Sequence, residues 1–305
     1  FYTGSLMSNF MENKDSLAKK ASYLRIAAAE LAEGMKEGNF RSLYRGQGIE
    51  FSGVRDYIRG DDIRAIDWNV TARMGRPYIK VFEEERELQI FLIVDTSLSM
   101  QLGSGKRTKF NSVAESIALL SMAAEMNSCP LGAVFFDGEI QFSCAPEHGR
   151  ERTMVILKQL EDLPQKAVSG SVLNQAITGA TKILRKRALI FIFSDFRTAD
   201  WEQPLAQLAH KNDVIAINVK DKFDQELPSI GSVPFIDCES SRTMVLPSSS
   251  EKFKKAWSEY NESGIRKWQD ICVKRGVFPA ILKTTDEPLK VLAEIFARQD
   301  GSSRK

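Results

Sequence analysis

Apolar and polar positions follow one another in a pattern that predicts a parallel sheet. Four short runs are almost wholly apolar and are bounded by polar residues: 88–94, 188–193, 214–219 and 277–282. Such runs are typical of strands buried on both faces. Apolar residues recur at helical spacing over 108–127, 150–162, 171–185, 201–210, 251–274 and 286–298. Strands alternating with helices of this length favour a parallel sheet that helices cover on both faces.

Two hairpins are predicted as departures from this pattern. Asp137-Gly138 lies between the apolar segments 133–136 and 140–142, and this dipeptide is a strong signal for a tight hairpin turn. Segments 235–238 and 243–246 could pair as a smaller, inserted hairpin. We therefore expect an α/β fold with a doubly wound, mainly parallel six-stranded sheet and one antiparallel edge strand.

The first part of the chain has a different pattern. Residues 14–38 have the apolar spacing of one amphipathic helix, with Gly38 as its stop. From Phe40 to about Pro77, five glycines interrupt any long element, and we expect irregular structure there. The predicted organisation is an N-terminal helix with an arginine-rich irregular region over 1–80, and the sheet domain over 81–300. Whether the first region packs on the sheet is left open.

Composition excludes several classes of function. The net charge of +2 is too near neutral for nucleic-acid or membrane adhesion through bulk electrostatics. The four cysteines form no CxxC pair and only two histidines accompany them, which argues against a zinc site. No apolar run approaches the ~20 residues of a membrane-spanning helix. With no basic leader before an apolar core, we expect a cytoplasmic protein.

Acidic and hydroxyl residues follow two of the predicted strands. Asp95, Ser97 and Ser99 come directly after one strand, and Asp195 ends another. The carboxyl ends of parallel strands lie at one edge of the sheet, where ligands bind. Oxygen donors without nitrogen or sulfur suit Mg²⁺ or Mn²⁺. The alternative is that these residues cap the helices that follow them. Thr108 is better placed to cap the helix over 108–127, and Thr198 or Asp200 is better placed to cap the helix over 201–210.

A fifth candidate ligand stands at the start of a predicted helix. Ser171 opens the segment 171–185, so capping of that helix is a serious alternative to metal binding. The two roles are compatible, because a helix start also lies at the sheet edge. The sequence leaves both open.

Two sets of motifs in the chain resemble those of known protein families. Asp95-Thr-Ser-Leu-Ser99 is similar to the DxSxS signature of the metal-ion-dependent adhesion site in von Willebrand factor A domains. The upstream motifs Gly53-Val-Arg-Asp-Tyr57, Gly60-Asp-Asp-Ile-Arg64, Ile66-Asp-Trp68 and Thr71-Ala-Arg73 resemble the bacterial and archaeal domain-of-unknown-function family 58. The combination is far more specific than DxSxS alone.

The resemblance implies a role for each candidate ligand. Ser97 and Ser99 would bind the metal directly, while Asp95 and Asp195 would act mostly through water. Ser171 would stand where these domains carry a threonine, a departure that keeps the hydroxyl and loses the methyl. Hydroxyl ligands donate little negative charge, so the ion would keep an open position for a carboxylate of a partner protein.

The resemblance also implies a function. Members of the family operate beside MoxR-type AAA+ ATPases in the maturation or remodelling of other complexes. We therefore expect a metal-dependent protein-interaction module and not an enzyme, with an ATPase as partner and a third protein as client. The alternative of a Mg²⁺-dependent phosphatase or phosphotransferase with Asp95 as nucleophile is disfavoured, because such enzymes commonly place an acid where Ser97 stands.

Arginines and acids are crowded together between Arg55 and Arg76. Such a density favours an internal network of arginines and carboxylates that docks this segment onto the sheet. Partner binding and nucleic-acid binding are the second and third alternatives, the last disfavoured because the acids nearly cancel the arginines. An interaction surface would include Arg55, Arg59, Arg64 and Arg73.

Overall fold

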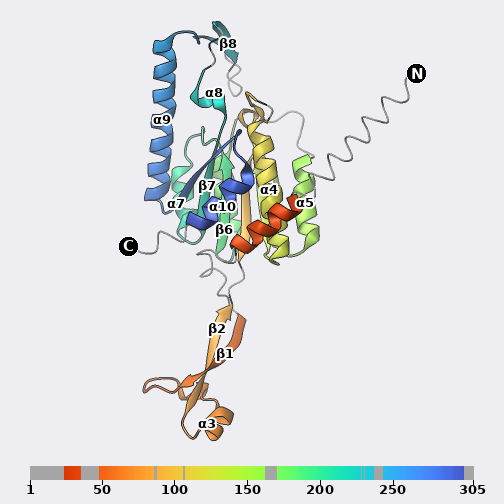
Figure 1. Ribbon diagram of the computed structural model, residues 1–305, viewed down its shortest axis with the longest axis vertical. Helices are drawn as coiled ribbons and strands as arrows, with labels where there is room; N and C mark the ends of the chain where they lie inside the picture. Colours follow the sequence, from red (N-terminus) through yellow and green to blue (C-terminus); the bar gives the residue numbers. More distant parts are fainter. Residues whose placement is uncertain are drawn as a thin grey trace, which may run out of the picture. The chain divides into compact units, whose positions relative to one another are not determined.

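The chain divides into two compact units, residues 1–38 with 89–305 and residues 39–88. The computed structural model describes residues 24–35, 48–85, 88–105, 107–161, 170–227, 229, 231–236 and 243–298 (Figure 1). The larger unit holds the predicted sheet, and the smaller one holds the arginine-rich segment.

The described residues of the larger unit form a six-stranded sheet. Its strand order is β10-β7-β6-β3-β4-β5, and β5 alone runs antiparallel to its neighbour. The strands span Gln89–Asp95 (β3), Leu131–Phe136 (β4), Ile140–Glu147 (β5), Ala188–Ser194 (β6), Asp213–Lys220 (β7) and Phe278–Lys283 (β10). The predicted fold class, including the antiparallel edge strand, is therefore confirmed.

Helices cover both faces of this sheet (Figure 1). Helices α6, α7 and α9 share one core with Phe91 and Ile93 of β3, while α4 contacts both α5 and α10. Since β3, β4 and β6 are buried along nearly their whole length, their sequences are apolar on both faces. The helices span Lys109–Met126 (α4), Arg150–Glu161 (α5), Leu173–Ile183 (α6), Glu202–Ala209 (α7), Lys222–Gln225 (α8), Glu251–Lys274 (α9) and Pro288–Arg298 (α10).

An N-terminal helix belongs to the sheet unit. It covers residues 24–35, and the rest of the predicted range 14–38 lies outside the described residues. The helix buries Ala28, Leu31 and Met35, and Asn127 Nδ2 at the end of α4 donates to Ala32 O at 2.9 Å. The helix thus groups with the sheet unit and not with the arginine-rich segment, which the predicted range 1–80 joined to it.

The arginine-rich segment is a two-stranded ribbon and not irregular. Strand β1 (Gly48–Asp56) pairs antiparallel with β2 (Tyr78–Glu85), with a register shift at Gly53. A 3-10 turn (η1, Ile63–Ala65) and the short helix α3 (Trp68–Met74) join them. The prediction of irregular structure was wrong, because Gly53 lies within β1 at its register shift and Gly60 and Gly75 lie between the elements. Gly60 and Gly75 have φ angles of 115° and 71°, which glycine adopts without strain.

The inserted hairpin is present as well. Strand β8 (Ser232–Ile236) pairs antiparallel with β9 (Thr243–Pro247), which confirms the predicted pairing. Residues 237 and 238 of the predicted first strand lie outside the described residues. Within the part of the chain that the structure describes, no helix combines the length and apolar character of a membrane span.

Candidate metal centre

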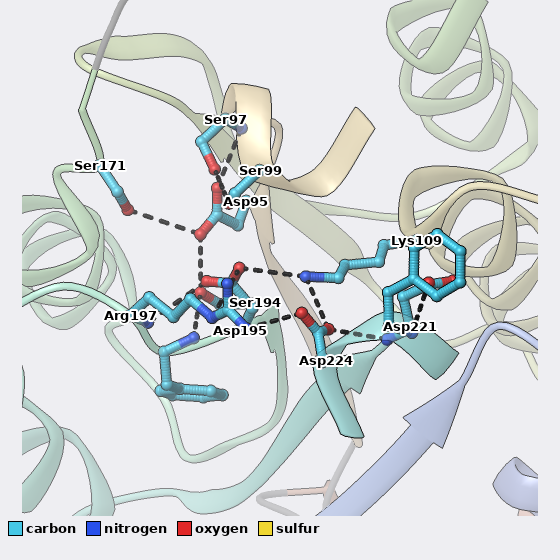
Figure 2. A network of polar contacts seen from close by, with 12 residues as sticks. Asp95, Ser97, Ser99, Lys109, Ser171, Ser194, Asp195, Arg197, Asp221 and Asp224 are labelled. Carbon is cyan, nitrogen blue, oxygen red and sulfur yellow. Dashed lines mark hydrogen bonds and ion pairs between the residues drawn. The ribbon is translucent and has the colours of Figure 1, made fainter. Parts of the chain in front are cut away.

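The carboxyl edge of the sheet brings all five candidate ligands together. Asp95 ends β3, Ser97 and Ser99 lie in the turn and 3-10 helix (η2, Leu98–Gln101) that follow, and Asp195 follows β6. Strands β3 and β6 are neighbours, with Val94 opposite Phe193. Ser171 approaches from the loop before α6. Figure 2 shows these side chains pointing toward one another.

Asp95 is the centre of a set of oxygen contacts. Its Oδ2 accepts a hydrogen bond from Ser194 Oγ at 2.6 Å and lies 3.5 Å from Ser171 Oγ. Its Oδ1 accepts from the backbone N–H of Ser97 at 3.0 Å. The hydroxyls of Ser97 and Ser99 lie 3.1 Å apart. Hydroxyl oxygens from three segments of the chain thus lie around one carboxylate.

The electrostatics of Asp95 favour a bound cation. Its side chain is buried, and this burial, with the nearby charge of Asp195, raises the pKa of the Asp95 carboxyl to about 6. Hydrogen bonds from Ser194 and Ser97 oppose the rise. A raised pKa means that the negative charge lacks compensation, and a cation beside the carboxylate would supply it. Among the described residues, no group of three or more His, Cys, Asp or Glu could hold a metal, so a cation here would depend on the serines.

Ser171 is held by backbone contacts and does not cap the helix after it. The N-cap of α6 is Val172, and no side chain caps the described start of that helix. Val172 N donates to Asp137 O at 2.8 Å, and Thr198 Oγ1 donates to Ser171 O at 3.2 Å. The capping alternative for Ser171 is therefore wrong, because its hydroxyl faces Asp95. Thr198 holds this loop instead of capping α7, whose N-cap is Trp201.

Asp195 is the start of a second polar network that the sequence did not predict. Lys109 Nζ lies 3.4 Å from Asp195 Oδ2 and 3.0 Å from Asp224 Oδ2. The backbone N–H of Arg197 donates to Asp195 Oδ1 at 3.2 Å, and the Arg197 guanidinium contacts Asp224 Oδ1 at 2.6 Å. Figure 2 shows Lys109 between the two carboxylates. Asp195 is therefore already partly neutralised, whereas Asp95 is not.

The sequence feature that relates to the second network is a lysine at the start of a helix. Lys109 is the first residue of α4, where the helix dipole disfavours a cation, and its side chain is nonetheless buried. Burial of a lysine at such a position requires carboxylate partners. Nothing local identifies Asp224 as one of them, since it forms a capping box with Asp221 at the start of α8.

The arginines of the ribbon are paired only in part. Arg55 makes two hydrogen bonds of 2.8 Å to the carboxylate of Asp61, which also accepts from Ile58 N. The hydrogen bonds from Arg55, with that of Ile58, lower the pKa of Asp61. Arg76 lies 3.8 Å from Asp56. The predicted internal network therefore exists in these two pairs, and both join residues within the ribbon.

The other acids of the ribbon cap helices. The Asp62 side chain accepts from Arg64 N at the start of η1, and the Asp67 side chain accepts from Asn69 N and Val70 N at the start of α3. Among the described residues, these two acids therefore accept from backbone N–H groups, while the arginine pairs involve Asp61 and Asp56. The side chains of Arg59, Arg64 and Arg73 are exposed, and within the described residues none of the three makes an ion pair.

Proteins of known sequence include relatives of this chain. An uncharacterized protein of Mycobacterium tuberculosis, Rv1480, is 31% identical over 227 residues, which cover 73% of this chain and 71% of the relative. The uncharacterized protein Mb1516 of Mycobacterium bovis has the same identity and coverage.

Solved structures with a similar fold include two of interest. One is an aerotolerance-related membrane protein from Bacteroides fragilis, with a TM-score of 0.45 and 15% identity, covering 70% of this chain and 98% of that one. The other is the SpRpn10 VWA domain, with a TM-score of 0.39 and 12% identity, covering 68% and 95%. At these identities the likeness concerns the fold alone.

A family model matches residues 53–265, a range that contains most of the ribbon and all five candidate ligands. The predicted α/β fold with a six-stranded, mainly parallel sheet is confirmed, while the adhesion-site role of the five residues stays a prediction. The model is described as "Protein of unknown function DUF58", and this chain belongs to that family.

Proposed function

We propose that the chain is a metal-dependent protein-interaction module. Asp95, Ser97, Ser99, Ser171 and Asp195 would hold a Mg²⁺ or Mn²⁺ ion, to which a partner protein adds an acidic side chain. The observation that carries the proposal is the buried Asp95 carboxylate, which has serine hydroxyls around it and whose pKa is raised to about 6.

The residues present fit a hard cation. All of the candidate ligands offer oxygen, the donor atom that Mg²⁺ and Mn²⁺ prefer. When bound, the ion would act as an electron-poor acceptor for a carboxylate oxygen. Ser194 keeps Asp95 oriented through its short hydrogen bond, and the contact between Val172 and Asp137 holds the Ser171 loop at the edge of the sheet.

Asp195 fits a more distant role than Asp95. One of its oxygens contacts Lys109 and the other accepts from Arg197 N, so both are engaged within the protein. A carboxylate engaged in this way suits contact with the ion through water better than direct binding. The same role is implied by the resemblance to von Willebrand factor A domains.

The proposal is one of binding without bond making. A phosphotransfer reaction with Asp95 as nucleophile would need a general acid nearby, commonly two residues further on. That position is Ser97, whose hydroxyl lies beside that of Ser99. Phosphate release from a phosphoester that depended on Asp95 would contradict this part of the proposal.

The nature of the partner is inferred from the family resemblance. A MoxR-type AAA+ ATPase would be the partner, a third protein the client, and the cytoplasm the location. The chemistry of the centre supports only the coarser statement that the partner presents a carboxylate.

Titration with Mn²⁺, followed by electron paramagnetic resonance of the free ion, tests the site. The wild-type protein should take up Mn²⁺, while Asp95→Ala should lose this uptake because the buried carboxylate at the centre of the site is gone. Asp270→Ala, which removes an exposed carboxylate from α9, is the matched control and should bind as the wild type does. Equal uptake by wild type and Asp95→Ala would contradict the proposal.

A further inference from the structure

The joined end of the ribbon exposes large apolar side chains. Ile58, Ile63, Trp68 and Met74 are each between 55% and 67% exposed. All four lie in η1, α3 and the loops that connect β1 to β2, which Figure 1 shows at one end of the strands. Exposed apolar residues scattered singly are normal on a protein surface, but four within one short connection mark an interaction site.

An arginine stands next to three of these apolar residues. The pairs are Ile58-Arg59, Ile63-Arg64 and Arg73-Met74. These arginines are exposed and make no ion pair within the described residues, whereas the neighbouring acids are already occupied. Asp61 binds Arg55, and Asp62 and Asp67 cap η1 and α3. Within the described residues, the guanidinium groups of these three arginines are therefore the charged groups at this end of the ribbon that stay available to a partner.

We define the tip surface as Ile58, Arg59, Ile63, Arg64, Trp68, Arg73 and Met74. Its composition is that of a protein interface, in which tryptophan, methionine and arginine are enriched and lysine is depleted. The one lysine of residues 53–80 is Lys80, in strand β2 and outside the tip. Arginine offers a planar pair of donors that matches a carboxylate, which a lysine ammonium does not.

We propose that the tip surface docks an acidic, amphipathic segment of a partner protein. Carboxylates of that segment would pair with Arg59, Arg64 and Arg73, while its apolar side chains would cover Trp68 and the neighbouring isoleucines. This docking goes beyond the metal centre and needs no ion. A lipid bilayer with anionic headgroups is the competing surface, and the experiment below separates the two.

Two labelled synthetic peptides serve as probes, and binding is followed by fluorescence anisotropy in EDTA. Both peptides are helical with the same leucine face, and the polar face carries glutamate in one and lysine in the other. The wild-type protein should bind the glutamate peptide and not the lysine peptide. The triple variant Arg59→Glu/Arg64→Glu/Arg73→Glu and the variant Trp68→Ala should each weaken this binding about tenfold or more.

Matched controls come from α9. Lys252→Glu/Lys255→Glu/Lys267→Glu makes the same change of charge at exposed positions, and Tyr260→Ala removes an aromatic side chain that is 76% exposed. Both controls should bind the glutamate peptide as the wild type does. Because EDTA is present throughout, failure of the metal centre would leave this result unchanged. Circular dichroism checks that each variant is folded, and Arg64→Gln alone is a milder second variant.

Three results would overturn the proposal. Equal binding of the two peptides would show that charge does not select the partner. Equal weakening by the α9 controls would show that the tip is not the site. Sedimentation with phosphatidylserine-containing vesicles, lost in Trp68→Ala and absent with phosphatidylcholine alone, would assign the tip to a lipid surface instead.

Discussion

The two units of the chain differ in how deeply their charged side chains are buried. At the carboxyl edge of the sheet, Asp95, Asp195 and Lys109 are buried, and each has specific polar partners. In the ribbon, Arg59 and Arg73 are exposed beside apolar side chains. Hydrogen bonds and ion pairs within the unit hold these groups in place, and of the two carboxylates only Asp195 has a cation beside it. The exposed arginines of the ribbon are solvated instead, and they remain available to a partner.

This difference indicates which kind of ligand each region can bind. A site built from buried carboxylates can be selective for a small cation, because its oxygens are held in place. A surface of exposed arginines and apolar side chains suits a larger partner that covers it. The predictions below separate the two regions through stability, since buried and exposed groups respond differently to the same substitution.

The largest effect is expected when the buried cation is removed. Lys109→Ala leaves the carboxylates of Asp195 and Asp224 without their shared ammonium, which should cost about 3–5 kcal/mol of stability. Urea unfolding measures the change. Lys255→Ala, at a position 81% exposed, is the control and should change stability by less than about 0.5 kcal/mol. A loss below about 1 kcal/mol in Lys109→Ala would refute the buried network.

A smaller loss is expected from adding one methyl group in the sheet. In Gly132→Ala the new Cβ would lie 2.7 Å from Pro146 N and 2.8 Å from Phe91 Cδ2, which should cost about 1–3 kcal/mol. Gly53 in the ribbon has no atom within 4 Å of that position. Gly53→Ala should therefore change stability by less than about 0.5 kcal/mol. Urea unfolding measures the stability of both variants. Similar losses of stability would contradict the expected difference in packing between the sheet and the ribbon.

The third prediction concerns pH in the absence of metal. The pKa of Asp95 is raised from 3.8 to about 6 in the folded protein, so the native state binds this proton more tightly than the unfolded state. This group therefore makes the protein less stable as pH rises from about 4 to about 6. In EDTA, wild type should lose about 1–2 kcal/mol relative to Asp95→Asn across that window. A constant difference between the two proteins would contradict the assigned burial.

The smallest effect belongs to the exposed tryptophan. Trp68→Ala should change the free energy of unfolding by less than about 0.5 kcal/mol, because its side chain is 67% exposed. Trp268→Ala removes a side chain that is 5% exposed in the sheet core, and should cost about 3–5 kcal/mol. If Trp68→Ala were as costly as Trp268→Ala, the tip surface would be part of a core and not a docking surface.

The sheet could be predicted from the sequence because the burial of each strand is evident from the strand's own residues. Strands covered on both faces must be apolar throughout, and the Asp137-Gly138 turn identifies the antiparallel edge. Asp95 and Asp195 could be recognised because each directly follows such a strand. The pairing of the ribbon could not be predicted in this way, because it depends on the register between residues such as Asp56 and Tyr78, which lie far apart in the sequence.

The partners of the site could not be predicted in the same way. Ser194 contacts Asp95 across 99 positions of the sequence, and Lys109 contacts Asp195 across 86. Such pairs depend on which strands and helices become neighbours, and no local pattern records that. Ser171 shows the same limit, because its spacing suits a helix cap while the tertiary structure turns its hydroxyl toward Asp95.

Thermal unfolding in EDTA, Mg²⁺ and Mn²⁺ tests the central claim most directly, with wild type and Asp95→Ala measured side by side. A metal that binds only the native state adds about 2.7 kcal/mol at a hundredfold excess over its dissociation constant. For a domain of this size that is a rise of several degrees in Tm. We predict this rise in wild type and none in Asp95→Ala. The same rise in both proteins, or none in wild type with millimolar Mn²⁺, would contradict the account.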